Sequence, residues 1–364
     1  MKQLVFLFLL ASYHPSADEI INRSTDALGG LQNIHKLQSL NFSGIYQEGS
    51  HKGEAHMTKM RPNLRLVGCL PQTCNEQTSD YLEGYDGSRG WEANLKRQRM
   101  IRTVGKAELA LRCGSEFDPM FVDYKQKGNR AEYIGEDLFE KKPVWIVRIS
   151  PPNCQIHDFY FDQQSFLPVA SRKLYNVHAR GEAVDLLTVY ADYREVNGVK
   201  IPFRDEEQDF KTGNAVSSTI WKTIEANTVR DVNLFEAPVV HPSAGTKLVL
   251  EMLEISQSKS PAEVLQTYRE FRSKPENKNL DMESDLNFLG YELLKADRYE
   301  LAIPVMEILV DEYPNSSNNF DSLGDAYLQK GDKDKAIAAF QKALELDPNA
   351  SGTKAKLDRL IALK

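Results

Sequence analysis

The chain has 364 residues, of which 41% are hydrophobic and 27% are charged, and its formal net charge is −7. This composition excludes a disordered chain, and the acidic balance disfavours a general nucleic-acid-binding protein, whose surface carries an excess of Lys and Arg. The length predicts two domains.

The first predicted element is a signal peptide over residues 1–17. Lys2 precedes an apolar run from Leu4 to Ala11, and small residues follow as far as Ala17. The run is too short to span a bilayer. We therefore expect an exported protein, periplasmic or secreted, whose mature chain begins near Asp18 and has no transmembrane span.

Residues 18–240 are predicted to form a β-rich domain with helices. An amphipathic helix over 18–28 ends at a glycine pair. Short runs rich in β-branched and aromatic residues follow, with connections of hairpin length, and this pattern predicts an antiparallel sheet. The clearest strands are 144–149, 157–162, 168–175, 184–193 and 215–224, and further helices are expected over 106–112 and 119–125.

The stretch GYDGSRGWEAN, residues 84–94, spaces three glycines three residues apart and could cradle a phosphate or present Ser88 as a nucleophile. A phosphate site needs a helix to follow the glycines, whereas a turn and another strand follow here. The pattern favours a hairpin turn that directs Trp91 towards the sheet.

Four cysteines, Cys69, Cys74, Cys113 and Cys154, would meet an oxidising compartment after export. We favour the pairs Cys69–Cys74 and Cys113–Cys154 among three possible connectivities. Four free buried thiols are the alternative.

After a linker the hydrophobic period becomes helical. Gly290 and Gly324 are 34 residues apart, as are Ala302 and Ala336, and this is the period of tetratricopeptide repeats. We expect a linker and a degenerate helical pair over 241–282, two repeats over 283–350 and a capping helix over 351–364.

Residues 18–240 resemble bacterial outer-membrane lipoprotein-sorting proteins, the LolA- and LolB-like family. The resemblance rests on DEIINRSTDALGGLQNIHKLQSLNFSG, YDGSRGW, VYADYREVNGVKIPF and NLFEAP, which occur in family order. It implies an α+β fold in which a half-open antiparallel β-barrel wraps helices around an apolar hollow. The C-terminal third resembles the tetratricopeptide tail of secreted bacterial hydrolases.

Catalytic motifs are weak. Lys211-Thr212-Gly213 and two SxxK patterns, which begin at Ser256 and Ser351, occur in the reverse of the order that serine β-lactamases use. His51 and His56 are five residues apart, which places their imidazoles on opposite faces of a strand. We expect no catalytic residues, no metal site and no cofactor.

Our first hypothesis is a non-enzymatic binding protein. The β-domain would shelter an acyl chain, lipid or lipoprotein segment, and the repeats would bind a protein partner. The candidate apolar residues are Trp91, Trp145, Phe159, Phe161 and Tyr190, and the candidate partner-binding residues are Asn287, Tyr291, Lys295, Asp321, Asp325 and Gln329. The alternatives are an interaction scaffold without cargo and an exported, hydrolase-associated protein with an unrecognised active site.

Overall fold

The structure is a computed structural model that describes residues 14–49, 51–68, 81–177 and 182–362. Cys69 and Cys74 lie outside these residues, as does most of the predicted signal peptide. None of the helices in the described ranges combines the length and the apolar character that crossing a bilayer requires.

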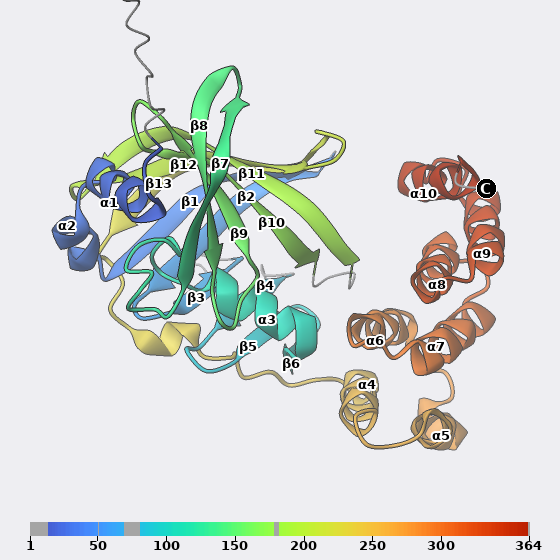
Figure 1. The fold of residues 1–364 in the computed structure, drawn as a ribbon. Coiled ribbons are helices and arrows are strands. Elements are labelled where there is room, and N and C mark those ends of the chain that lie inside the picture. Colours follow the sequence, from blue (N-terminus) through green and yellow to red (C-terminus); the bar gives the residue numbers. More distant parts are fainter. Residues whose placement is uncertain (1–13, 50, 69–80, 178–181, 363–364) are drawn as a thin grey trace, which may run out of the picture. The chain divides into compact units, whose positions relative to one another are not determined.

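Thirteen strands are present among these residues (Figure 1). They are β1 (Ser39–Glu48), β2 (His51–Met60), β3 (Leu64–Val67), β4 (Leu82–Tyr85), β5 (Gly90–Asn94), β6 (Arg99–Arg102), β7 (Arg130–Phe139), β8 (Lys142–Ser150), β9 (His157–Asp162), β10 (Pro168–Val177), β11 (Glu182–Val196), β12 (Val199–Asp209) and β13 (Ala215–Ala226). The five strands predicted most clearly correspond to β8, β9, β10, β11 and β13.

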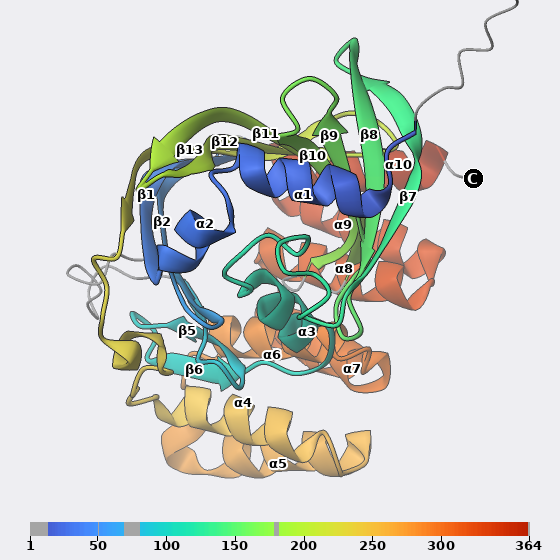
Figure 2. The ribbon, with the colours of Figure 1, turned by 60° about the vertical axis from the view of Figure 1, so that its left-hand side comes forward.

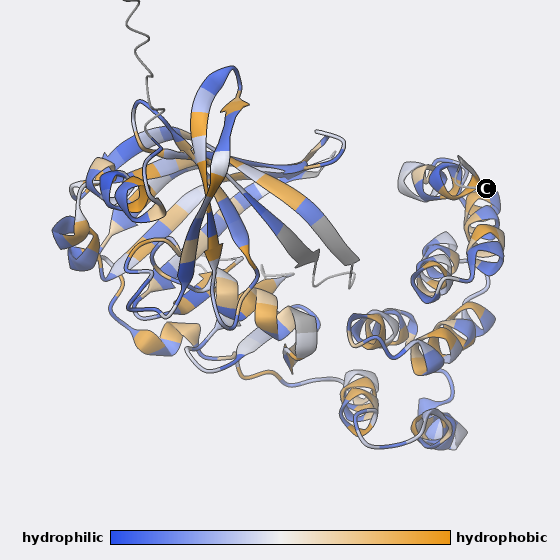
Figure 3. Ribbon diagram, in the orientation of Figure 1, coloured by the Kyte–Doolittle hydropathy of each residue, from blue (hydrophilic) through white to orange (hydrophobic). Residues whose placement is uncertain are grey.

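The helices complete the fold. They are α1 (Ala17–Ala27), α2 (Leu31–Lys36), α3 (Gly105–Gly114), α4 (Ala244–Ile255), α5 (Pro261–Ser273), α6 (Glu283–Lys295), α7 (Tyr299–Glu312), α8 (Ser317–Lys330), α9 (Lys333–Leu346) and α10 (Ser351–Ala362), with short 3-10 helices η1 (Val232–Phe235) and η2 (Pro275–Asn277). Hydrophobic and hydrophilic stripes alternate on α6 to α9 (Figure 3), as expected of helices that pack along one face.

The strands form one antiparallel sheet in the order β6-β5-β4-β3-β2-β1-β13-β12-β11-β10-β9-β8-β7. Almost every strand pairs with its neighbour in sequence, as hairpin connections dictate, and β13 returns to pair with β1. The sheet is open, with β6 and β7 at its edges. The predicted α+β class, an antiparallel open sheet with helices followed by helical repeats, is confirmed.

The chain divides into two compact units. One comprises residues 1–55, 116–174 and 185–229, and the other comprises residues 56–115, 175–184 and 230–364. The second unit therefore contains β3 to β6 as well as α4 to α10. The predicted domain boundary near residue 240 remains a proposal.

In the first unit, the strands β1 and β7 to β13 curve around α1 and α2 (Figure 2). Ser16 caps α1 by accepting a hydrogen bond from the Glu19 amide. Ile20 and Ile21 are buried on the side of α1 that faces inwards. Burying such a stripe of aliphatic side chains is what holds a short helix against a sheet.

The predicted helix over residues 119–125 is wrong. The segment forms successive turns instead, because Asp123 has a φ of +52°, which an α-helix cannot contain. Its backbone hydrogen bonds do not keep one spacing. The Val122 amide donates to the Pro119 carbonyl, three residues earlier, and the Lys127 amide donates to the Asp123 carbonyl, four residues earlier. The segment nevertheless brings Phe121 into the core, where its ring packs edge-on against Phe159 and Phe161.

In the second unit, α5 begins with the capping box that its sequence predicts: Ser260 and Glu263 each bond to the other's backbone amide. Gly290 and Gly324 stand where paired helices cross. A Cβ on Gly290 would lie 2.6 Å from Met306, and one on Gly324 would lie 2.5 Å from the Phe340 ring. The 34-residue repeat of glycine therefore has a packing cause.

Candidate functional site

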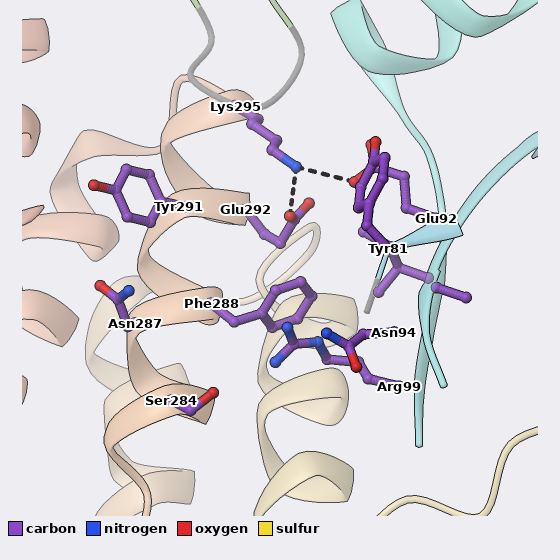
Figure 4. Close-up of a pocket in the computed structure, with 12 residues that line it drawn as sticks. Tyr81, Glu92, Asn94, Arg99, Ser284, Asn287, Phe288, Tyr291, Glu292 and Lys295 are labelled. Carbon is purple, nitrogen blue, oxygen red and sulfur yellow. Dashed lines mark hydrogen bonds and ion pairs between the residues drawn. The ribbon is translucent and has the colours of Figure 1, made fainter. Parts of the chain in front are cut away.

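A pocket of about 300 Å³ lies within the second unit, between α6 and the hairpin of β5 and β6 (Figure 4). Both walls carry charged side chains beside aromatic and aliphatic ones. Its lining residues are Tyr81, Glu92, Ala93, Asn94, Arg99, Ile101, Ser284, Asn287, Phe288, Tyr291, Glu292 and Lys295. A pocket that mixes apolar walls with a few polar groups is typical of ligand sites.

The hairpin wall follows from strand alternation. Glu92 pairs with Ile101, and Asn94 pairs with Arg99, so these four side chains share one face of the hairpin. Trp91 points to the opposite face and is 1% exposed. The hairpin thus buries its tryptophan on one side and presents polar groups on the other.

The helical wall follows from the period of α6. Ser284, Asn287, Tyr291 and Lys295 recur at intervals of three and four residues, which places them on one stripe of the helix. The opposite stripe contains Leu286 and Leu289, which are fully buried in the helical core. Packing in the repeats therefore fixes which side chains α6 presents to the pocket.

Lys295 links the two walls. Its ammonium group lies 2.6 Å from Glu292 Oε1 and 3.3 Å from Glu92 Oε2, and all three side chains are only 10–11% exposed. Burial opposes the charge of Lys295, but the two carboxylates raise its pKa. Burial and the nearby charge of Glu92 raise the pKa of Glu292. Removing one member of a buried charge cluster is costly, because it leaves the remaining charges buried and uncompensated.

Arg99 forms a second polar point in the pocket. Its guanidinium stacks over the Phe288 ring, 3.6 Å from the centroid. Its NH1 atom lies 3.8 Å from Asp285 Oδ1, which is too long for a hydrogen bond. Burial lowers the pKa of Arg99. Among the residues that the structure describes, the buried NH1 atom has no hydrogen-bond partner.

Asn287 has a similar unsatisfied atom. Its buried Oδ1 oxygen accepts no hydrogen bond from any described residue. Tyr291, one turn further along α6, donates its hydroxyl to Asp325 Oδ2 at 3.0 Å. Within the described part of the chain, Asn287 thus has an acceptor and Arg99 a donor that make no hydrogen bond.

The predicted partner-binding residues fall into two groups. Asn287, Tyr291 and Lys295 line the pocket. On α8, Asp321 and Asp325 face α10 instead, where the Lys356 ammonium lies 2.8 Å from an oxygen of each. Gln329 lies on the same helix, α8. Their role in binding remains a prediction.

The predicted apolar residues pack against several different neighbours, and their role in ligand binding remains a prediction. Trp91 donates its indole N–H to the Phe235 carbonyl at 2.8 Å. Trp145 packs against Phe166, with ring centroids 4.8 Å apart. Phe159 and Phe161 both pack against Phe121. Tyr190 hydrogen-bonds to Ser171, and burial raises its pKa to about 12.

The Gly84–Asn94 stretch is a hairpin turn, as predicted. Asp86 Oδ1 accepts hydrogen bonds from the Ser88 amide, the Ser88 hydroxyl and the Arg89 amide, and Arg102 pairs with its other oxygen. Burial alone would raise the pKa of Asp86, but these donors hold it well below its usual range. The Ser88 hydroxyl therefore donates its hydrogen bond within the turn.

The other catalytic motifs also have structural roles. The Asp209 carboxylate stabilises the turn by accepting hydrogen bonds from the backbone amides of Lys211 and Thr212. The Ser256 hydroxyl donates to the Leu253 carbonyl, while Lys259 pairs with Glu263. Neither motif brings a serine to a lysine in the part of the chain that the structure describes.

Cys113 and Cys154 are both disulfide-bonded, so the prediction that the chain contains a disulfide is supported. The pairing pattern remains a prediction, and Cys69 and Cys74 lie outside the described residues. Within those residues, no group of three or more His, Cys, Asp or Glu side chains is placed to hold a metal ion.

Comparison with known proteins identifies one part of the helical region. Residues 322–350 match the family model of the tetratricopeptide repeat, and this span includes most of α8 and all of α9. These residues form a tetratricopeptide repeat.

Cellulose synthase operon protein C of Escherichia coli K12 and its putative counterpart in strain O157:H7 are each 46% identical to this chain over 50 residues. The match covers 14% of this chain and 4% of either relative. This chain therefore spans only a small part of the length of those proteins.

Three solved structures are similar to about 60% of this chain. A LolA superfamily protein from Nitrosomonas europaea is 11% identical, and the match covers 61% of this chain and 99% of that chain with a TM-score of 0.42. A DUF1329 family protein from Desulfovibrio piger is 10% identical, with 60% of this chain and 97% of that chain covered and a TM-score of 0.41. A putative outer membrane lipoprotein-sorting protein domain from Vibrio parahaemolyticus is 12% identical, with 60% of this chain and 95% of that chain covered and a TM-score of 0.40.

Sequence reasoning missed Glu92, Arg99 and Phe288 as pocket residues. The available signal was the alternation of Glu92 and Asn94 with Trp91 and Ala93, which predicts one polar face on the hairpin. That face could not be matched to α6 from sequence, because about 200 residues separate the two walls.

Proposed function

We propose that this chain is a non-enzymatic binding protein that captures a peptide segment of a partner in the pocket between α6 and the β5–β6 hairpin. The tetratricopeptide repeat over residues 322–350, which shares a hydrophobic core with α6, supports protein binding by the helical region. The pocket provides a defined place for it.

One observation carries the proposal. Arg99 NH1 and Asn287 Oδ1 are buried polar atoms that no described residue satisfies. Leaving such atoms unpaired costs about 1–3 kcal/mol each, so a ligand that pairs with them gains affinity. A peptide main chain offers both a carbonyl acceptor for Arg99 and an amide donor for Asn287.

The apolar lining suits the same ligand. Phe288 and Ile101 give a short aliphatic or aromatic side chain a surface to cover. The Lys295 cluster closes one end of the pocket with groups that are already paired. We therefore expect a short extended peptide with one apolar side chain.

Phage display of random peptides against the full mature chain tests this proposal. Selected peptides would be measured by isothermal titration calorimetry against the wild-type chain and the variants Arg99→Gln and Asn287→Leu. Each substitution is expected to weaken binding about tenfold, which corresponds to about 1.4 kcal/mol.

Lys342→Gln is the matched control. Lys342 is a surface lysine on α9 that pairs with Glu345, so its loss changes the net charge without touching the pocket. Peptides that bind both pocket variants as tightly as the wild type would overturn the proposal. So would a selection that yields no binding peptide.

An apolar ligand in the β-domain is a second candidate. The observation that favours it is the cover over Phe159 and Phe161, which is a segment of turns rather than a regular element. Lys125 pairs with Asp18 at the rim of this segment, and Asp123 pairs with His35. These contacts are exposed and weak, so the main cost of opening the segment is the exposure of the buried Phe121 and Val122.

Burying an acyl chain contributes roughly 0.8 kcal/mol per methylene group. Native mass spectrometry of the purified chain, with lipid extraction, tests whether the β-domain carries a lipid. A mass shift and an extracted lipid would support it. The absence of co-purifying lipid, together with no saturable uptake of a fluorescent fatty acid, would favour the cargo-free scaffold.

We also propose that the protein is exported. The N-terminal apolar run and the disulfide-bonded Cys113 and Cys154 both fit an oxidising compartment. Fractionation of cells that express the full chain, with N-terminal sequencing of the mature protein, tests the predicted cleavage near Asp18.

A further inference from the structure

A band of polar side chains crosses the inner face of the first unit. The face is defined by Phe159, whose ring packs against Phe121 inside the curve of the sheet. Strand register places further residues on this face, because directly paired residues point to the same side. We call them the polar band: His157, Ser171, Lys173, Thr188, Tyr190, Asp205, Glu207, Ser217 and Thr219.

The centre of the polar band is acidic. Asp205 and Glu207 lie two residues apart on β12 and therefore point the same way. Lys173 lies 3.9 Å from Glu207 and provides one positive charge for the pair. Burial, with the charge of Lys173, lowers the pKa of His157 to about 3, so His157 is neutral at pH 7. Lys173 therefore acts on both carboxylates, and its single positive charge is smaller than their combined negative charge.

Asp205 lacks a complete set of partners. Thr219 hydrogen-bonds to its carboxyl group, but the buried Oδ2 atom has no partner among the described residues. Thr188, which pairs with Glu207 across the strands, is 7% exposed, and its hydroxyl is also unsatisfied within the described part of the chain. Two buried oxygens on one face therefore lack a hydrogen-bond partner among the described residues.

The aromatic neighbours suit a cation as well. Tyr190 is the register partner of Asp205 on β11. Tyr46 on β1 pairs with Thr219, which in turn pairs with Asp205. Tyrosine rings attract cations through their faces, and a carboxylate between two tyrosines combines both kinds of attraction. An anion would be repelled here, and an apolar group would leave both oxygens unpaired.

We propose that the polar band binds the ammonium group of a primary amine, with Asp205 as the main counter-ion. The ammonium donates one hydrogen bond to Asp205 Oδ2 and another to the Thr188 hydroxyl. This site is separate from the pocket beside α6 and does not depend on peptide binding there.

Isothermal titration calorimetry of the full mature chain with hexylammonium, hexanoate and hexanol tests the inference. The three probes share a chain length and differ in their head groups. We expect saturable binding of hexylammonium at least tenfold tighter than that of the other two. Equal affinity for all three would show that the apolar chain drives binding, and it would overturn the proposal. Absence of hexylammonium binding would overturn it as well.

Asp205→Asn is expected to weaken hexylammonium binding at least tenfold. Glu206→Gln is the matched control, since Glu206 lies between Asp205 and Glu207 but points to the other face, where it pairs with Arg204. The control should bind like the wild type. Melting temperatures of both variants identify a folding defect, and an Asp205→Asn chain that melts like the wild type and still binds hexylammonium normally would refute the assignment.

Discussion

Lys295 lies 3.3 Å from Glu92, although 203 residues separate them in the chain. Lys295 also pairs with Glu292 on its own helix, and all three side chains are almost fully buried. Replacing Lys295 with Met would remove the ammonium group that pairs with both buried carboxylates. We expect the free energy of unfolding to fall by about 3 kcal/mol, measured by urea denaturation.

A double-mutant cycle separates this pair from general packing. Glu92→Gln alone should cost less than Lys295→Met, because Lys295 keeps Glu292 as a partner. If the two substitutions are additive, Glu92 and Lys295 are not coupled.

The glycine at the crossing of α8 and α9 should be essential to packing. Gly324→Ala would place a Cβ 2.5 Å from the buried Phe340 ring. We expect a loss of about 2 kcal/mol in the free energy of unfolding, despite the better helix propensity of alanine. Thermal unfolding measures the loss.

Gly352→Ala is the control for helix propensity. A Cβ on Gly352, in α10, would have no neighbour within 4 Å. This variant should be neutral or more stable by up to about 1 kcal/mol. Equal destabilisation by the two substitutions would contradict the crossing-point explanation.

Asp205 should make the protein less stable as pH rises. Burial and the charge of Glu207 raise its pKa to about 6, against about 3.9 in an unfolded chain. The folded state therefore binds more protons between these values, so the free energy of unfolding falls as pH increases from about 4 to about 6. The full effect is about 3 kcal/mol, at 1.36 kcal/mol per pH unit.

Asp205→Asn removes this contribution. The variant should be more stable than the wild type at pH 7, and the difference should vanish near pH 4. Urea denaturation at a series of pH values measures it. A difference that stays constant across this range would show that Asp205 does not titrate as described.

Asp86 should have the opposite pH dependence. Its hydrogen bonds with Ser88, Arg89 and Arg102 hold its pKa well below the usual range. Its contribution is therefore present above the unfolded pKa of about 3.9 and is lost as pH falls below it. Asp86→Asn should cost about 2 kcal/mol at pH 7 and progressively less in acid, which denaturation at low pH would reveal.

Much of the fold follows from local sequence patterns. The β-branched runs of β8 to β11 and β13, the glycine stop after α1 and the capping box of α5 all depend on neighbouring residues. The 34-residue glycine spacing predicted the paired helices, because the packing that requires glycine recurs with each repeat. Such signals need no knowledge of distant contacts.

Features that depend on the assembled structure could not be predicted from local sequence patterns. Residues 119–125 have a helical composition, but Asp123 adopts a left-handed conformation that propensity alone does not reveal. Asp205 and Glu207, which register places on the inner face of β12, were not among the candidate site residues selected from the sequence. Alternation divides the residues of a strand into two faces, but only the assembled sheet determines which face points inwards.

Trp91 gives the protein a built-in optical reporter. Its indole N–H is held by the Phe235 carbonyl, in the short helix η1 that precedes α4. An indole that is 1% exposed emits at shorter wavelength than the partly exposed Trp145 and Trp221. The emission of Trp91 therefore reports whether the segment that leads from the strands into the helices is docked against β5.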